Sequence, residues 1–395
     1  MKKHKIFIST AGNITPYLHK ELLSLGFKEL SILNTGIFLE ASSDEIMGLN
    51  LALRSANHIF LLIKEFECAN PDELYKQVAA IEWENIIFED GYVSIFSNVS
   101  NPTIRDNRFA NLKCKDAIVD RLLKLKGRRP DSGPNRDKTV VYLYWVDKRC
   151  SIYIDTSGES LSKRGYRKIP LKAPLNETLA AAIILATNWQ GKTHFINPMC
   201  GSGTLAIEAA FMALNRAPSI LRRNFGFMHT KLFEASSFEK IKKELIKKEN
   251  RKIDSKILAT DIDKYAIEAA YKNACNARVE NYIEFKVCDY KQTPVPEAPG
   301  IIIMNPEYGI RLGRINELES LYEEIGDFLK QKCNGFNAYI FSGNINLLKK
   351  IRLKTQKKLI FFNADIECRL YEYQLYKGSK REPKITREHH REGLS

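Results

Sequence analysis

Apolar and polar residues alternate with short periods in the first third of the chain. Runs with a period of two predict strands, and apolar residues spaced by three and four predict amphipathic helices. The predicted strands are Lys5–Ser9, Ile37–Glu40, Gly91–Ser97, Thr139–Trp145 and Ser151–Asp155. The predicted helices are Tyr17–Leu25, Asp72–Ile81 and Asn111–Leu125. This mixture indicates an α+β unit.

From Pro174 onward the pattern changes to apolar strands that are separated by helical stretches. The predicted strands are Lys192–Asn197, Lys256–Asp261, Ile283–Val287, Gly300–Asn305 and Asn337–Phe341. The predicted helices are Thr204–Asn215, Lys264–Ala277 and Leu318–Lys330. Such alternation is typical of a parallel sheet wrapped by helices. The predicted fold class is therefore α/β, with the α+β unit in front of it.

Two segments and the absence of long apolar runs complete the pattern. Residues 221–250 form a polar insertion rich in Lys and Glu, and the basic residues after Gly378 lack apolar periodicity, which predicts a disordered tail. No apolar run approaches the roughly 18 residues that a membrane span requires, and Met1–Leu18 lacks the apolar stretch of a signal peptide. We expect a soluble cytoplasmic protein without membrane contact.

Composition and charge indicate a polyanionic partner. The 395 residues suffice for two to three domains at about 150 residues each. The net charge is +14, and residues 105–172 alone hold 18 Lys and Arg against 8 Asp and Glu. A basic patch of this kind favours nucleic acid. The eight cysteines and seven histidines include no Cys-x-x-Cys or His-x-x-x-His spacing, so we expect reduced thiols and no metal.

The segment from Phe195 to Thr204 is the most informative one. An apolar strand enters a turn that contains Gly201 and Gly203, and a helix follows. Glycine lets a ligand approach the backbone, and the free N–H groups of the helix favour an anionic group. No Lys follows the second glycine, which excludes a phosphate-binding P-loop. Taken alone, the two glycines have an equally good steric explanation as a tight turn.

Acidic and polar residues end the following strands in order. In a doubly wound sheet the ligand lies at the carboxyl ends of adjacent strands. Asp261, with Asp263 behind it, can accept hydrogen bonds from ribose hydroxyls, and Asp289 can accept one from an adenine amino group. The fourth strand ends in Asn-Pro-Glu-Tyr-Gly at 305–309. Each acid alone is more often a helix cap, but capping does not explain the whole series.

Together these motifs resemble those of the class I S-adenosylmethionine-dependent methyltransferases. More narrowly, the chain resembles the THUMP-domain RNA guanine-N2 methyltransferases, which include the N-terminal half of the bacterial 23S rRNA enzyme and the tRNA guanine-N2 enzymes. The resemblance covers about Lys5 to Lys377. Further matching motifs are Phe109–Asp120, Gly127–Pro130, Asp155–Arg167 and Pro174–Ala180.

The resemblance implies domains, a cofactor and its binding residues. It implies a ferredoxin-like module (1–60), a THUMP RNA-binding domain (61–165), a Rossmann-like methyltransferase domain (166–377) and the basic tail (378–395). The implied cofactor is S-adenosylmethionine, and the implied partner is structured RNA bound by a monomer. The expected cofactor-binding residues are Asn197, Pro198, Cys200, Gly201, Gly203, Thr204, Asp261, Asp263 and Asp289.

The expected catalytic residues are Asn305, Pro306, Glu307 and Tyr308. The exocyclic amine of guanine is a poor nucleophile, so an enzyme must align nitrogen, methyl and sulfur and accept hydrogen bonds from the amine protons. The Asn305 side-chain oxygen and the Pro306 carbonyl are suitable acceptors, and Tyr308 can stack on an extruded base.

The sequence departs from the family at two positions. The family usually has Asp at Asn197 and Pro at Glu307. A carboxylate at Glu307 matches the adjacent N1–H and N2–H donors of guanine, while a solvent-facing Glu307 is an equally good interpretation.

Basic residues in the first part predict the RNA contacts. We expect Arg105, Arg108, Lys113, Arg164 and Arg167 to contact phosphates. The alternative for Arg164 and Arg167 is that they pair with Glu177 or Asp155 at the domain junction, and Tyr166 is expected in the core.

The predicted reaction is methyl transfer to N2 of a guanosine, with 23S rRNA favoured over tRNA as the substrate. Methylation of adenine N6 in DNA uses a similar Asn-Pro-Pro-Tyr motif, but the THUMP-like segment disfavours it. A catalytically degenerate RNA-binding assembly factor is the alternative from another class, because Glu307 alters the motif.

Overall fold

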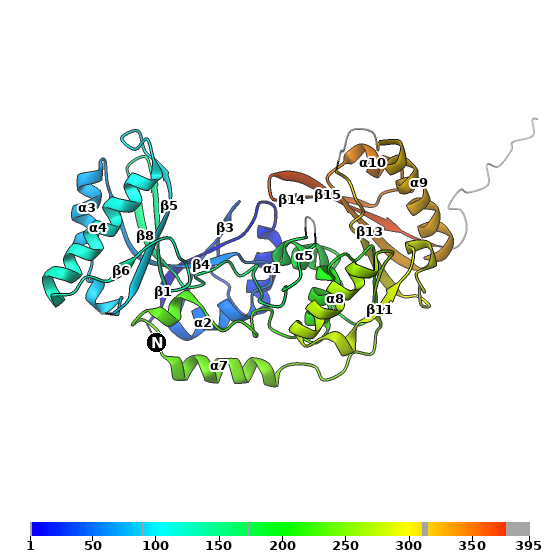
Figure 1. The fold of residues 1–395 in the computed structure, drawn as a ribbon, viewed down its shortest axis with the longest axis horizontal. Helices are drawn as coiled ribbons and strands as arrows, with labels where there is room; N and C mark the ends of the chain where they lie inside the picture. Colours follow the sequence, from blue (N-terminus) through cyan, green and yellow to red (C-terminus); the bar gives the residue numbers. More distant parts are fainter. Residues whose placement is uncertain (1, 89, 172–173, 310–314, 377–395) are drawn as a thin grey trace, which may run out of the picture.

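The computed structural model describes residues 2–88, 90–171, 174–309 and 315–376. The first part of the chain forms one eight-stranded sheet in the order β2-β3-β1-β4-β8-β7-β5-β6 (Figure 1). Its strands are β1 (His4–Ser9), β2 (Ser31–Leu33), β3 (Gly36–Ala41), β4 (His58–Glu67), β5 (Tyr92–Ser100), β6 (Asp131–Ser132), β7 (Thr139–Val146) and β8 (Arg149–Asp155). Its helices are α1 (Thr15–Ser24), α2 (Ser43–Ala52), α3 (Pro71–Ala79) and α4 (Asn107–Lys126).

Strand β4 joins the two halves of this sheet. It pairs antiparallel with β1 on one side and with β8 on the other. The boundary expected between residues 60 and 61 therefore falls inside β4. One core of Ile, Leu and Val side chains runs under both halves, from Ile6 on β1 to Leu143 on β7.

The second part is a seven-stranded sheet in the order β11-β10-β9-β12-β13-β15-β14. Its strands are β9 (His194–Pro198), β10 (Ile257–Asp261), β11 (Glu284–Val287), β12 (Gly300–Met304), β13 (Phe336–Ser342), β14 (Lys357–Asn363) and β15 (Ile366–Gln374). The first five are parallel, and β15 is antiparallel to both β13 and β14. The carboxyl ends of β9, β10, β11 and β12 consequently meet at one edge of the sheet.

Helices cover both faces of this sheet. One face packs against α5 (Glu177–Ala186), α6 (Thr204–Ala213) and α8 (Lys264–Ala277), and the other against α9 (Ile315–Lys332) and α10 (Ile345–Lys349). Strand β12 lies in the middle and is buried along its whole length, which explains its unbroken apolar sequence Ile301–Met304. The predicted fold class, α/β preceded by an α+β unit, is confirmed.

The insertion after α6 folds back onto the first sheet. Its helix α7 (Ala235–Lys247) packs along α2, below the N-terminal strands in Figure 1. Phe225, Phe227 and Phe238 of the insertion lie in the core of the N-terminal part. From the polar composition of residues 221–250 we predicted only an insertion. The structure shows that the aromatic residues of this insertion join the two parts of the chain.

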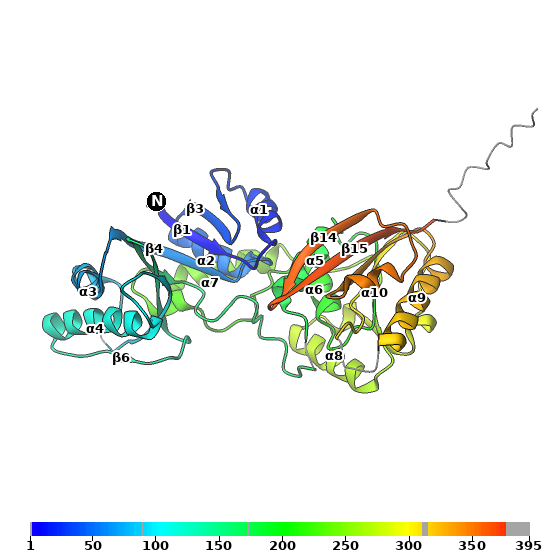
Figure 2. The same ribbon diagram turned by 90° about the horizontal axis from the view of Figure 1, so that it is seen from above.

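The β14–β15 hairpin also reaches toward the N-terminal part, as Figure 2 shows from above. The ring of Phe361 on β14 stacks on Tyr17 of α1, with 5.8 Å between the ring centroids.

No helix in the described part of the chain is long and apolar enough to cross a membrane. The basic tail predicted after Gly378 lies outside the described residues.

Candidate functional site

The loop between β9 and α6 is shaped by its two glycines. Gly203 has φ +81°, and a Cβ there would lie 2.9 Å from the Cβ of Ala270 on α8. Gly201 has φ +54°, but no neighbouring heavy atom lies within 4 Å of the place where its Cβ would be. Left-handed backbone favours glycine at both positions. The loop is therefore packed tightly against α8 at Gly203 and leaves open space at Gly201.

Asp261 connects this loop to the end of β10. Its Oδ2 atom accepts a hydrogen bond from the Gly201 N–H at 2.9 Å, and Oδ1 accepts one from the Asp263 N–H at 3.0 Å. Each carboxylate oxygen can accept a further hydrogen bond. Asp261 thus places acceptor capacity next to the open space at Gly201.

The other two predicted acids cap helical turns. Asp263 accepts a hydrogen bond from Tyr265 N at the start of α8, and Asp289 accepts one from Lys291 N at the short 3-10 turn Tyr290–Gln292. These are the cap roles that single acids commonly have. Both acids nevertheless lie at the same edge of the sheet as Asp261.

The remaining predicted loop residues have local structural roles. Pro198 is the last residue of β9. Cys200 donates its N–H to the Thr260 carbonyl at 3.0 Å, and burial raises the pKa of its thiol well above the usual range. Thr204 begins α6 and accepts a hydrogen bond from Arg167 at 3.0 Å. The loop is thereby fixed to β10 and to the segment before α5.

Asn197 lies one residue before the end of β9, and Asn305 directly follows the adjacent strand β12. The Asn197 side chain is buried and donates from Nδ2 to the Ile303 carbonyl at 2.9 Å. The Oδ1 atoms of both asparagines are buried and have no hydrogen-bond partner among the described residues. Because an unpaired buried acceptor is costly, two of them at one edge of the sheet indicate a place where a ligand donates hydrogen bonds.

Tyr308 is held in place from two sides. Its hydroxyl accepts hydrogen bonds from Asn363 Nδ2 at 3.1 Å and from the Cys368 thiol at 3.8 Å, both on the β14–β15 hairpin. Its ring lies against Gly343, where a Cβ would come within 2.7 Å of the ring. Burial raises the pKa of Tyr308, so the hydroxyl is neutral at ordinary pH.

The two residues between Asn305 and Tyr308 differ in exposure. Pro306 is buried, and the Glu307 side chain is exposed. The Glu307 carbonyl accepts a hydrogen bond from the Tyr322 hydroxyl at 3.4 Å. The backbone of this segment is therefore anchored while the Glu307 carboxylate remains accessible.

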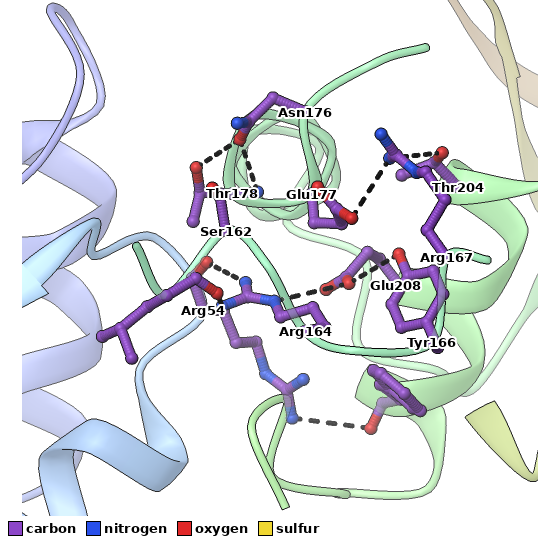
Figure 3. Close-up of polar contacts among 12 residues, drawn as sticks. Arg54, Ser162, Arg164, Tyr166, Arg167, Asn176, Glu177, Thr178, Thr204 and Glu208 are labelled. Carbon is purple, nitrogen blue, oxygen red and sulfur yellow. Dashed lines mark hydrogen bonds and ion pairs between the residues drawn. The ribbon is translucent and has the colours of Figure 1, made fainter. Parts of the chain in front are cut away.

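Arg164 and Arg167 lie at the junction of the two parts (Figure 3). Arg164 is fully buried, with its Nε 3.6 Å from Glu208 Oε1, and it also donates to the carbonyls of Arg54 and Leu161. An Arg164 contact with RNA is therefore wrong, because no part of the side chain reaches the surface. Its partner is Glu208, which neither sequence alternative named.

Arg167 is mostly buried and bridges three segments of the junction. Its Nη2 donates to Thr204 Oγ1 at 3.0 Å and lies 3.4 Å from Glu177 Oε1. The pairing of Arg167 with Glu177 was one of the two alternatives, and it is present. Tyr166 is in the core, as expected, and donates from its hydroxyl to Glu208 at 3.1 Å.

The three other predicted RNA contacts lie at the opposite end of the molecule. Arg105 precedes α4, and Arg108 and Lys113 lie on it, in the part of the N-terminal sheet farthest from the methyltransferase-like sheet in Figure 1. Arg108 pairs with Asp106 at 2.7 Å, and Lys113 pairs with Asp72 at 3.3 Å. The structure does not bring these residues together with Asn305 and Asp261.

One apolar residue at the site escaped the sequence analysis. Ile262, between the two acids after β10, is 71% exposed, and Val287 at the end of β11 is 47% exposed. The exposed side chain of Ile262 offers an apolar surface to a flat ring. The signal in the sequence was its position at a strand end.

Three family models match the chain. The RMKL-like methyltransferase domain matches residues 164–372, the THUMP domain matches 68–155, and the RlmL ferredoxin-like domain matches 5–60. These matches confirm the resemblance that the motifs indicate.

Curated relatives are similar over nearly the whole chain. The ribosomal RNA large subunit methyltransferase K/L of Psychromonas ingrahamii is 38% identical over 93% of this chain and 50% of its own length. The protein of the same name from Buchnera aphidicola is 35% identical over 94% of this chain and 54% of its own length. The chain thus spans about half the length of these relatives.

A solved structure agrees with the fold. A methyltransferase crystallised with S-adenosylhomocysteine is 27% identical, has a TM-score of 0.86, and aligns over 96% of this chain and 100% of its own. TrmN from Thermus thermophilus, at 18% identity and a TM-score of 0.70, shares the fold over 94% of this chain.

Proposed function

Because the chain belongs to the family of RMKL-like methyltransferase domains, we propose that it transfers a methyl group from S-adenosylmethionine to N2 of a guanosine in 23S rRNA. The observation that carries this proposal is the buried Oδ1 of Asn305, directly after β12, which has no hydrogen-bond partner within the described part of the chain. It lies one strand away from the glycine loop, because β9 and β12 are neighbours in the sheet.

The residues at the carboxyl edge fit S-adenosylmethionine. The open space at Gly201 leaves room for the methionine part of the ligand. The carboxylate of Asp261 can accept further hydrogen bonds, as ribose hydroxyls require. The exposed side chain of Ile262 offers an apolar surface for the adenine ring. When bound, the cofactor supplies an activated methyl group on its sulfonium. Binding of S-adenosylhomocysteine by the solved neighbour supports this assignment.

Asn305 and Pro306 then act on the amine. The lone pair of the guanine N2 is delocalised into the ring, so the nitrogen needs acceptors that polarise its N–H bonds as the new N–C bond forms. The Oδ1 of Asn305 accepts a hydrogen bond from one of these N–H groups, and the carbonyl of the neighbouring Pro306 accepts one from the other. Methyl transfer breaks the S–CH3 bond, forms the N2–CH3 bond and leaves N2 positively charged and more acidic, so N2 then loses one proton to water.

Tyr308 holds the base in place. Its hydroxyl is anchored by Asn363 and Cys368, so the orientation of the ring is fixed before the base arrives. Base flipping into such a site costs a few kcal/mol of unstacking, which stacking on an aromatic ring offsets. A fixed ring reduces the entropy that is lost on binding.

The names of the relatives support large-subunit rRNA as the substrate. An rRNA substrate also places the reaction in the cytoplasm. A tRNA substrate would undergo the same reaction, because the guanine N2 amine has the same N–H donors in either RNA.

The test is methyl transfer by the purified chain with labelled S-adenosylmethionine, using unmodified 23S rRNA and tRNA in separate reactions. Nucleoside mass spectrometry then identifies the product. We expect N2-methylguanosine from the rRNA. Label in N6-methyladenosine would contradict the base assignment, label only in tRNA would contradict the substrate, and cofactor binding without any transfer would favour the degenerate assembly factor.

A further inference from the structure

A large cavity lies beside the junction of the two parts. Its volume is about 1350 Å³, and three segments line it: residues 159–168 with 174–177 before and at the start of α5, residues 216–249 of the insertion, and residues 276–278 at the end of α8. None of the expected catalytic or cofactor-binding residues lines this cavity. It is therefore separate from the site at Asn305 and Asp261.

The lining is strongly basic. Eight Lys and Arg residues line the cavity against three carboxylates. Each carboxylate already pairs with one of these cations. The pairs are Lys163–Glu159 at 2.7 Å, Arg167–Glu177 at 3.4 Å and Arg216–Glu249 at 3.0 Å. The acidic residues of the lining consequently leave the other cations without a counter-charge.

Arg222 has a structural role in the wall. Its guanidinium donates to the carbonyls of Ser157, Glu159, Ser160 and Asn224 at 3.0–3.3 Å, and it stacks on Phe225 at 4.7 Å. Burial lowers the pKa of Arg222 to about 10. Because Phe225 is part of the N-terminal core, these contacts fix the insertion against the segment before α5.

Four cations remain around the cavity: Lys168, Arg223, Lys242 and Arg278. Their side chains form no hydrogen bond or ion pair with the residues that the structure describes. They come from all three segments that line the cavity. Cations that line one cavity without a counter-charge give it a positive potential, which attracts a polyanion.

We infer that this cavity binds the phosphodiester backbone of the RNA whose guanosine is methylated. The inference rests on the proposed function, because RNA is the polyanion which that function requires. A cavity of this volume exceeds the usual size of a small-ligand pocket, and its cations are spread over three segments, as suits an extended chain of phosphates. A concave wall cannot present four cations to a flat lipid surface.

The cavity is connected to the cofactor loop through Arg167. The same guanidinium pairs with Glu177 in the cavity wall and donates to Thr204, the residue after Gly203. RNA phosphates held here lie against the segment that fixes the loop. This position differs from that of Arg105, Arg108 and Lys113, so the cavity is a distinct RNA contact.

The test compares two triple variants of equal charge. One variant replaces Arg223, Lys242 and Arg278 with Gln. The control replaces with Gln three exposed lysines that do not line the cavity, Lys330, Lys332 and Lys354. Binding of 23S rRNA is measured between roughly 50 and 300 mM salt. Each lost phosphate contact lowers the log–log salt slope by about 0.7–0.9, so we expect a reduction of about two units or more in the cavity variant.

Affinity of the cavity variant for the RNA should fall at least about tenfold at moderate salt, while the control stays close to the parent chain. Affinity for S-adenosylmethionine should be unchanged in both variants. Equal salt slopes in the two variants would overturn the inference. Displacement of the RNA from the parent chain by low-millimolar inorganic phosphate would also overturn it, because a small-anion site would explain that result. The cavity is tested by RNA binding and the proposed function by methyl transfer. A chain that fails to transfer the methyl group can therefore still confirm or contradict the inference about the cavity.

Discussion

Asn197 donates a hydrogen bond from its side-chain Nδ2 to the backbone carbonyl of Ile303 at 2.9 Å. This bond joins β9 to β12 close to the start of the glycine loop and of the segment 305–308. A carboxylate at this position has no proton to donate at neutral pH. The family's usual Asp thus cannot form this contact. Asparagine can, because its Nδ2 group donates to the Ile303 carbonyl on the neighbouring strand.

Asn197→Asp should therefore destabilise the protein, although it restores the residue that is usual in the family. The change removes a buried hydrogen bond and places a charge beside a carbonyl, which costs about 1–3 kcal/mol of unfolding free energy. Denaturant unfolding measures it. The matched control is Asn337→Asp on β13, whose side chain makes no hydrogen bond with the described residues. Equal stabilities of the two variants would contradict the role of Asn197.

Asn305→Ala should nearly abolish methyl transfer, because it removes the acceptor that N2 requires in the transition state. Loss of one such group typically lowers the rate by about 10²–10³-fold. Single-turnover kinetics with labelled cofactor measure the rate. Asn305→Asp keeps an oxygen acceptor and should retain more activity than the alanine variant. Similar rates in the alanine variant and the parent chain would remove Asn305 from the mechanism.

Asp261→Ala should weaken the binding of S-adenosylmethionine by about 1–3 kcal/mol, because ribose hydroxyls lose their acceptor and the Gly201 N–H loses its partner. Isothermal calorimetry on the folded variant measures this change. The control is Asp254→Ala, whose side chain is 90% exposed. Unchanged affinity in the Asp261 variant would exclude this residue from the cofactor site.

Glu208→Ala should destabilise the junction more than any change at the surface. The guanidinium of Arg164 and the carboxylate of Glu208 are both fully buried, so removing one partner leaves the other charge buried and unpaired. Breaking a buried pair in this way costs about 3–5 kcal/mol. Denaturant unfolding measures the cost, with Glu244→Ala on the exposed face of α7 as the control. A loss as small as that of the control would show that Arg164 finds other partners.

The parallel sheet and its loop could be predicted from the sequence because their signals are local. Apolar strands, a glycine turn and acids at strand ends each occupy a few consecutive residues, and they predicted β9, β10, β11 and β12 along the chain. Their order in the sheet, β11-β10-β9-β12, was not predicted. Strand β4 was not among the predicted strands. Its apolar run Ile59–Ile63 does not alternate, and a short continuous apolar run fits a buried helix as well as a strand. The pairing of Arg164 with Glu208 joins residues far apart in sequence, and no periodicity indicates such a contact.

The insertion shows the same limit. Its lysines and glutamates dominate the composition of 221–250, and the few phenylalanines that enter the N-terminal core carry no period of their own. The cavity lined by Arg223, Lys242 and Arg278 follows from that packing. The sequence predicted a basic patch at residues 105–172, but Arg223, Lys242 and Arg278 lie outside that range, and tertiary contacts place them around the cavity.

Glu307 offers the sharpest test of base recognition. Its carboxylate is exposed and lies between the buried Pro306 and the anchored Tyr308, so it can reach a base that stacks on the tyrosine. If it accepts from N1–H and N2–H of guanine, Glu307→Gln replaces one acceptor with a donor while keeping the shape. Methyl transfer should then fall by about 10-fold or more, the effect of about 1.4 kcal/mol or more in the transition state.

Glu307→Pro gives the opposite expectation. It restores the family's usual residue and stiffens the segment, so activity should be retained through Asn305 and the Pro306 carbonyl. Glu297→Gln, an exposed glutamate on the other side of β12, is the control for a change of charge. Single-turnover rates at saturating RNA separate the two interpretations, because a solvent-facing Glu307 predicts parent-like rates in all three variants. That result would exclude base reading by the carboxylate while the role of Asn305 is tested independently.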